Sequence, residues 1–199
     1  MKAAFIIFDR MTALDFIGVY DPVTRLKSMG FLQDLTWDIC ATSERVTDDK
    51  GLIFTPTRTG AALNGYDLVI VPGGFGTRAL TEQPAFIDWL RTAADCTLKA
   101  SVCTGALLLG AAGFLEGRRA TTHRNAFQEL AKYCLTVLDD RVVDDGDVVT
   151  ARGVTSALDL GLHLVQRFAG PEARDRIRRQ MDYQPAARTS GTKLRSPRR

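Results

Sequence analysis

The sequence predicts an α/β fold in which a mainly parallel sheet is flanked by helices on both faces. Short apolar runs alternate with segments of helical spacing along the chain, and this order is typical of parallel sheets covered by helices. The runs are apolar almost throughout, as expected for strands buried on both faces. No internal repeat or linker divides the 199 residues, a usual length for one domain.

Apolar runs at residues 3–8 and 66–71 predict buried strands, and residues 36–41 and 98–102 predict two more strands. Two further segments predict shorter strands. The segment 44–57 is a polar excursion with short strands. The segment 141–150 predicts a hairpin that turns at Asp145 and Gly146.

Helical spacing of apolar residues predicts a helix after most of these strands. Asp15 is placed to cap the first helix, and Gly30 is placed to end it. Pro171 opens a final helix, since proline is well tolerated in a first turn. The other predicted helices cover residues 15–29, 84–94, 104–112, 125–132 and 155–168.

Composition excludes several classes of protein. Hydrophobic residues make up 45% of the chain and charged residues 25%, an ordinary globular mixture and not a disordered, collagen-like or membrane-spanning one. The first apolar run stops at Asp9 and Arg10, too early for a signal-peptide core or a spanning helix. We therefore expect a cytoplasmic protein with no membrane partner.

The net charge of +3 is unevenly distributed. Residues 182–199 hold five basic residues and one acid, so this segment carries +4 and the rest of the chain −1. The segment has too few apolar residues to bury a core. We expect one domain over residues 1–181 and a basic, flexible tail over 182–199. The nearly neutral body argues against a nucleic-acid partner.

Three features of chemical interest follow predicted strands. Asp15 comes after the first strand and its loop, Pro72-Gly73-Gly74 after the strand at 66–71, and Cys103 after the strand at 98–102. Ligands of parallel sheets bind beyond the carboxyl ends of the strands. We therefore expect these features to converge on one site.

Cys103 lies in the sequence SVCTG at 101–105, which has the layout of a nucleophile elbow with sulfur in place of oxygen. A thiol at the start of a helix can have its pKa lowered from about 8.5 into the range of about 3.5–7.5. The alternative is a buried structural cysteine. The other three cysteines, Cys40, Cys96 and Cys134, are expected to be inert.

The remaining candidates have both a functional and a structural interpretation. The backbone amides of Gly74 and Thr104 could stabilise developing negative charge. Asp15 is either a helix cap or a general acid/base with a raised pKa. His123 could point into the site or be a structural residue. Dispersed cysteines and only two histidines are too few ligands for a zinc site, so no metal is expected.

From about residue 3 to about residue 180, the chain resembles the ThiJ/PfpI superfamily, and most closely its isocyanide hydratase branch. The superfamily blocks are VPGG at 71–74, SVCTGA at 101–106, ATTH at 120–123 and DVVTARG at 147–153. The blocks similar to the hydratase branch are LDFIG at 14–18, GRRATTH at 117–123 and QMDYQP at 180–185.

The resemblance implies a flavodoxin-like, class I glutamine-amidotransferase-like sandwich, a homodimer and cofactor-independent hydration of an isocyanide, R–NC, to an N-substituted formamide. It implies catalytic roles for Cys103, Asp15 and Thr104. It also implies oxyanion or substrate-binding roles for Gly73, Gly74, Thr104 and His123.

Two alternatives stay open. One is a glyoxalase or deglycase acting on reactive carbonyls, with His123 as proton shuttle, although those branches carry a glutamate where this chain has Asp15. The other is a non-enzymatic redox sensor, since a thiolate at a helix start oxidises readily to sulfenic acid.

Overall fold

Strands and helices alternate along residues 1–184, which are the residues that the computed structural model describes. The strands are β1 (Lys2–Ile6), β2 (Thr36–Ala41), β3 (Val46–Thr47), β4 (Ile53–Phe54), β5 (Arg58–Thr59), β6 (Leu68–Val71), β7 (Leu98–Val102), β8 (Arg119–Ala120), β9 (Thr136–Val137), β10 (Val142–Asp144) and β11 (Val148–Ala151). The helices are α1 (Ala13–Ser28), α2 (Thr77–Thr81), α3 (Pro84–Arg91), α4 (Gly105–Ala111), α5 (Phe127–Leu130), α6 (Ser156–Gln180) and the 3-10 turn η1 (Arg124–Ala126).

Seven of the strands form one sheet, in the order β10-β11-β7-β6-β1-β2-β5. All neighbours in this sheet are parallel except β10 and β11, which form the predicted antiparallel hairpin. The carboxyl ends of β1, β6, β7 and β11 therefore meet at the same edge. The predicted mainly parallel α/β fold is confirmed.

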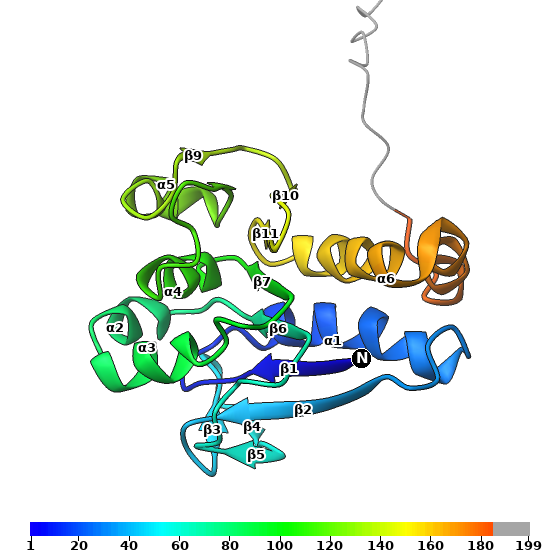
Figure 1. Cartoon of the computed structure of the whole chain (residues 1–199), viewed down its shortest axis with the longest axis horizontal. Coiled ribbons are helices and arrows are strands. Elements are labelled where there is room, and N and C mark those ends of the chain that lie inside the picture. Colours follow the sequence, from blue (N-terminus) through cyan, green and yellow to red (C-terminus); the bar gives the residue numbers. More distant parts are fainter. Residues whose placement is uncertain (185–199) are drawn as a thin grey trace, which may run out of the picture.

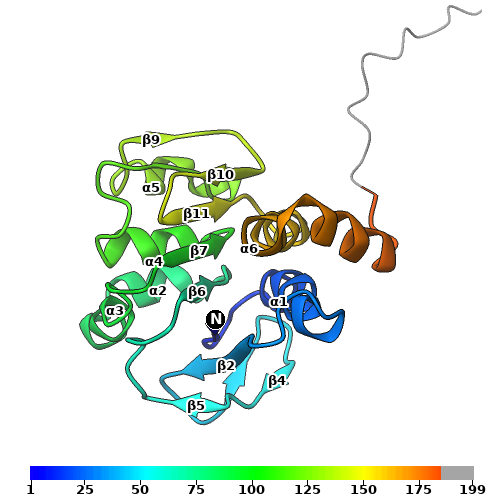
Figure 2. The same ribbon diagram turned by 45° about the vertical axis from the view of Figure 1, so that its right-hand side comes forward.

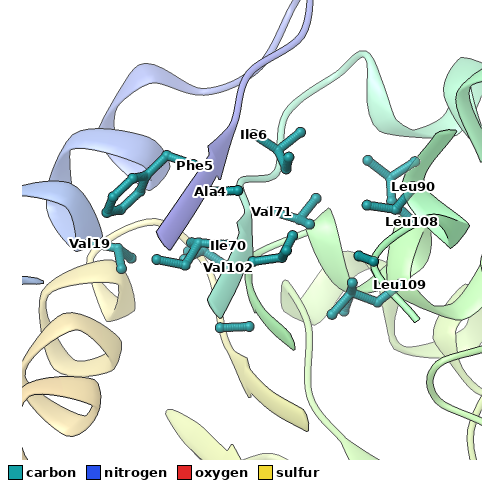
Figure 3. Packing of buried hydrophobic residues seen from close by; sticks show 14 of the residues in the cluster. Ala4, Phe5, Ile6, Val19, Ile70, Val71, Leu90, Val102, Leu108 and Leu109 are labelled. Carbon is teal, nitrogen blue, oxygen red and sulfur yellow. The ribbon is translucent and has the colours of Figure 1, made fainter. Parts of the chain in front are cut away.

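Helices cover both faces of the sheet. Helices α1 and α6 pack side by side on one face, and α2, α3 and α4 lie on the other (Figures 1 and 2). Successive strand residues point to opposite faces. In Figure 3, Phe5 and Ile70 lie toward Val19 of α1, whereas Val71 lies toward Leu108 of α4. Burial on both faces explains why these strands are apolar throughout.

Most predicted elements occur within one or two residues of their predicted bounds, but three differences matter. Helix α1 begins at Ala13 with Thr12 as its N-cap, so the prediction that Asp15 caps this helix is wrong. The helix predicted over 125–132 is reduced to η1 and α5. The short elements β5, α2 and β9 were not predicted, because segments of two to five residues carry no readable periodicity.

Helix α6 is kinked, and packing of the chain continues beyond residue 181. Helix α6 is interrupted at Gly170, where φ is 83°, and a second helical segment follows from Pro171 as predicted. Tyr183 packs on the apolar cluster of α1 and α6, and its hydroxyl donates to Asp159 at 2.8 Å. The folded part thus continues past the predicted boundary at 181, and the rest of the predicted tail, 185–199, lies outside the described residues. Along residues 1–184, no helix has the length and apolar character needed to cross a bilayer.

Gly105 allows α4 to begin directly against the end of β6. A β-carbon at this position would lie 2.7 Å from the Pro72 carbonyl oxygen and even closer to that of Val71. We expect Gly105→Ala to lower the free energy of unfolding by about 2–4 kcal/mol, since neither backbone carbonyl can move cheaply.

Urea denaturation measures this loss. Gly113→Ala is the matched control, because Gly113 has a φ of 91° but open space around it, so only about 1 kcal/mol of backbone strain is expected there. Equal losses in the two variants would contradict steric crowding at Gly105.

Candidate active site

Cys103 occupies a strained turn between β7 and α4. Its φ is 55°, an unusual value for a residue with a side chain. The turn is held by two hydrogen bonds: the Cys103 N–H donates to the Ala151 carbonyl at 2.9 Å, and the Thr122 hydroxyl donates to the Cys103 carbonyl at 2.7 Å. Strain maintained by its surroundings is typical of functional positions. Cys103 therefore lies in the strand–turn–helix geometry that the sequence predicted.

Asp15 reaches the same point from the first turn of α1. Its side chain is completely buried, and its Oδ2 accepts the Gly73 N–H at 3.0 Å. Its Oδ1 has no hydrogen-bond partner among the described residues. A β-carbon on Gly73 would lie 2.9 Å from Asp15 Oδ2 and 2.7 Å from Cys103 Cβ. The carboxyl, the cysteine and the glycine therefore meet at one point, and the lack of a side chain at Gly73 leaves the space between them open.

Burial raises the pKa of the Asp15 carboxyl to about 7. Withdrawal from water disfavours the charged carboxylate, and the charge of Asp49 adds to this effect. The hydrogen bonds from Gly73 and Cys103 act in the opposite direction without cancelling it. Asp15 thus has the raised pKa expected of a general acid/base, and it can be either protonated or charged near neutral pH.

The pKa of Cys103 is shifted opposite to the sequence prediction. Burial, followed by the nearby charge of Asp15, raises the pKa of the thiol to about 12. The amide and hydroxyl of Thr104 and the amide of Val154 lower it, but less. The prediction of a lowered pKa is wrong because a helix start stabilises a thiolate only where desolvation is small, and Cys103 is 6% exposed.

The two shifts assign the resting proton to sulfur. Since the pKa of Asp15 lies well below that of Cys103, the carboxyl loses its proton first as pH rises. The singly charged pair then holds a carboxylate beside a thiol. In this state Asp15 is a base next to the nucleophile that it would have to activate.

The predicted pair of free amides at Gly74 and Thr104 needs correction. The Gly74 N–H donates to Thr104 Oγ1 at 3.0 Å, so it is already occupied. The Thr104 N–H and the Val154 N–H instead act on the Cys103 sulfur. Sequence reasoning missed Val154, although it directly follows the block DVVTARG at 147–153. Only the packing of the β11–α6 connection beside β7 brings it to the thiol.

A cavity of about 650 Å³ opens over Cys103. Thr104, Gly74, His123 and Val154 are among its lining residues, whereas Asp15 is not, so the carboxyl is enclosed behind the thiol. The His123 Nδ1 accepts the Asn125 N–H at 3.3 Å, and its ring lies against Gly153. His123 therefore lies in the cavity wall, the first of the two positions considered for it, and the local backbone sets its orientation.

The other cysteines lie away from this cavity. Cys40 and Cys96 are buried in the core, and Cys134 is half-buried beyond α5. No group of three or more metal-ligating side chains is found in the part of the chain that the structure describes. The candidate chemistry thus rests on Cys103 and Asp15.

The chain is similar in sequence and fold to several known proteins. The chain is 35% identical to an isonitrile hydratase of Pseudomonas putida over 187 residues, 94% of this chain and 80% of the relative. It is 30% identical to a glutathione-independent glyoxalase, DJR-1.2, of Caenorhabditis elegans over 134 residues, 67% of this chain and 68% of the relative. The crystal structure of a ThiJ/PfpI family protein from Pseudomonas syringae superposes with a TM-score of 0.85 at 30% identity, covering 95% of this chain and 77% of that one.

The model of the DJ-1/PfpI family matches residues 1–167, a span that includes the elbow, the Gly73 loop and Asp15. The predicted ThiJ/PfpI resemblance is thereby confirmed, and the chain belongs to the DJ-1/PfpI family.

Proposed function

We propose that this protein hydrates isocyanides to N-substituted formamides, with Cys103 as nucleophile and Asp15 as general acid/base. The observation that carries the proposal is the enclosed Asp15 carboxyl beside a thiol that opens into a cavity. The likeness to the isonitrile hydratase of Pseudomonas putida supports the same activity.

In the first step, the Asp15 carboxylate accepts the thiol proton while the Cys103 sulfur bonds to the terminal carbon of R–NC. Asp15 then delivers this proton to the same carbon. The product is a thioimidate, R–N=CH–S, attached to Cys103. Because the pKa of the Cys103 thiol lies above that of Asp15, this proton transfer is uphill by itself and has to be coupled to formation of the sulfur–carbon bond. The raised pKa of Asp15 makes the carboxylate a stronger base than an ordinary aspartate and leaves it able to deliver the proton to carbon near neutral pH.

In the second step, water adds across the C=N bond, and Asp15 carries a proton from the water oxygen to the nitrogen. The carbon–sulfur bond then breaks as the carbonyl forms, and the hydroxyl proton returns through Asp15 to the sulfur. The amides of Thr104 and Val154 favour negative charge on the departing sulfur. The sum is R–NC plus water to R–NH–CHO, and no cofactor enters it.

The test is to incubate the purified protein with methyl isocyanide and follow N-methylformamide by proton NMR. We expect formamide to accumulate over many turnovers. Stable modification of Cys103 with no formamide would contradict the proposal. Oxidation of Cys103 without turnover of any substrate would favour the redox-sensor alternative.

A glyoxalase activity is the second candidate, favoured by the likeness to the Caenorhabditis elegans enzyme and by His123 in the cavity wall. In that case Cys103 would attack the aldehyde carbon of methylglyoxal, and His123 would move the proton. Lactate formation from methylglyoxal, measured beside the isocyanide assay, distinguishes the two reactions.

The homodimer and the cytoplasmic location stay predictions. Sedimentation of the full chain measures the first, and fractionation of the source cells measures the second.

A further inference from the structure

Three large apolar side chains are exposed at the cavity above Cys103. Leu14, Leu52 and Phe75 all line this cavity, with exposed fractions of 47%, 56% and 65%. They are half of the large apolar side chains that are exposed along residues 1–184. Exposed apolar surface gathered around a cavity is typical of a ligand-binding site.

These side chains come from three different parts of the fold. Leu14 lies in α1, Leu52 lies in the turn between β3 and β4, and Phe75 lies in the loop between β6 and α2. They surround a cavity to which Cys103 also contributes. An isocyanide is linear and reacts at its terminal carbon. Once that carbon reaches the sulfur, the R group has to point away from the thiol and into the space between the apolar side chains.

The charged side chains of the cavity already have partners. The Arg78 guanidinium donates to both carboxylate oxygens of Glu129, at 2.8 and 2.7 Å. The Lys50 ammonium donates to Asp49 at 2.7 Å. A charged R group would have to break one of these pairs or be buried without a counter-charge, and both are costly.

The Asp48 carboxylate is likewise occupied. Its Oδ1 accepts the backbone N–H groups of Lys50 and Leu52, at 2.8 and 2.7 Å. The hydrogen bonds of Asp48 therefore stabilise the turn itself. The part of the turn that is available to contact a substrate is the apolar side chain of Leu52.

Hydrogen bonds fix the backbone around Phe75, whereas its side chain is exposed. The N–H groups on either side of it are anchored, that of Gly74 to Thr104 Oγ1 at 3.0 Å and that of Gly76 to the Arg10 carbonyl at 3.1 Å. The anchored loop fixes the Cα position, while the exposed ring can rotate over the cavity. An aromatic ring placed in this way can cover an apolar substituent at little cost in backbone order.

Building on the proposed function, we infer that the substrate carries a bulky, uncharged, apolar R group and that Phe75 is a specificity-determining residue that packs on it. The inference goes beyond the reaction itself, which needs only the terminal carbon and nitrogen. The inference concerns which R groups the protein accepts, and the R group takes no part in the bonds that form and break at the sulfur.

The experiment compares kcat/KM for three probes: methyl isocyanide, benzyl isocyanide and isocyanoacetate. For the unmodified protein we expect benzyl isocyanide to exceed methyl isocyanide by at least tenfold and isocyanoacetate to be the poorest. We expect Phe75→Ala to lower kcat/KM for benzyl isocyanide about tenfold more than it lowers kcat/KM for methyl isocyanide. Leu52→Ala should have a smaller effect in the same direction.

Leu135→Ala is the matched control, because Leu135 is 70% exposed and lies outside this cavity. This variant should leave kcat/KM unchanged for both substrates. Equal losses for methyl and benzyl isocyanide in Phe75→Ala would overturn the inference, as would a preference for isocyanoacetate. If Phe75→Ala also lowers the mass of the protein in solution, with both substrates affected equally, the apolar side chains form an interface between copies and the inference is wrong. Turnover of methyl isocyanide by the unmodified protein tests the proposed function separately.

Discussion

Replacing Cys103 by alanine is expected to lower kcat/KM for isocyanide hydration by a factor of at least about 10³. In the proposed mechanism the sulfur forms the bond that divides the addition into two steps, and among the described residues Cys103 is the only cysteine that lines the cavity. Binding of the substrate should persist, because the apolar lining of the cavity is unchanged. Formamide production by NMR and a competitive binding assay against benzyl isocyanide measure the two effects.

The matched control is Cys134→Ala, which removes a half-buried thiol that does not line the cavity. It should retain the rate of the unmodified protein. If Cys103→Ala also retained that rate, the covalent mechanism would be wrong. A melting temperature within a few degrees of the unmodified protein shows that any lost rate is not a loss of fold.

Replacing Asp15 by asparagine is expected to have two large and opposite effects. It should lower kcat/KM by about 10²–10⁴, because the amide can neither accept the thiol proton nor deliver it to carbon. It should also stabilise the fold at alkaline pH, since asparagine resembles the protonated acid and brings no charge into a buried position.

The pH dependence follows from the direction of the shift. The pKa of Asp15 is raised from 3.8 in the unfolded chain to about 7 in the folded protein, so between these values the folded state binds more protons. The contribution of Asp15 to the free energy of unfolding therefore falls as pH rises from about 4 to about 7, by up to about 4 kcal/mol. Asp15→Asn lacks this pH-dependent loss of stability. Its free energy of unfolding should exceed that of the unmodified protein at pH 8 and equal it, within about 1 kcal/mol, at pH 4.

Urea unfolding of both proteins at pH 4, 6 and 8 measures the difference between their free energies of unfolding. The contributions of all other titrating groups cancel in this difference, because the two proteins share them. Asp21→Asn is the control on the same helix, because Asp21 is a surface residue paired with Arg25. Parallel stability curves for Asp15→Asn and the unmodified protein would show that Asp15 is not desolvated. In the activity assay, kcat/KM of the unmodified protein should rise through about pH 7, as the carboxylate base forms.

Patterns along the chain were enough to predict the sheet and the position of Cys103 at the turn between a strand and a helix. Mainly apolar runs identify β1, β6 and β7, because strands buried on both faces hold few polar side chains. The short spacing from β7 through Cys103 to Gly105 predicts the elbow, since only a glycine fits where α4 begins against β6. These features depend on neighbours within a few residues, and such neighbours are visible in the sequence.

The chemistry of the site was decided by contacts between distant segments. Asp15 is separated from Gly73 by 58 residues, and their hydrogen bond distinguishes a buried acid from a helix cap. The Gly74 amide is occupied by Thr104, and Val154 reaches the sulfur from the start of α6.

The direction of a pKa shift depends on how much water the folded protein removes from a group and on which dipoles replace that water. Neither quantity is encoded in the few residues around the group. The sequence alone therefore determined which side chains could react, and the tertiary structure decided which of them holds the proton.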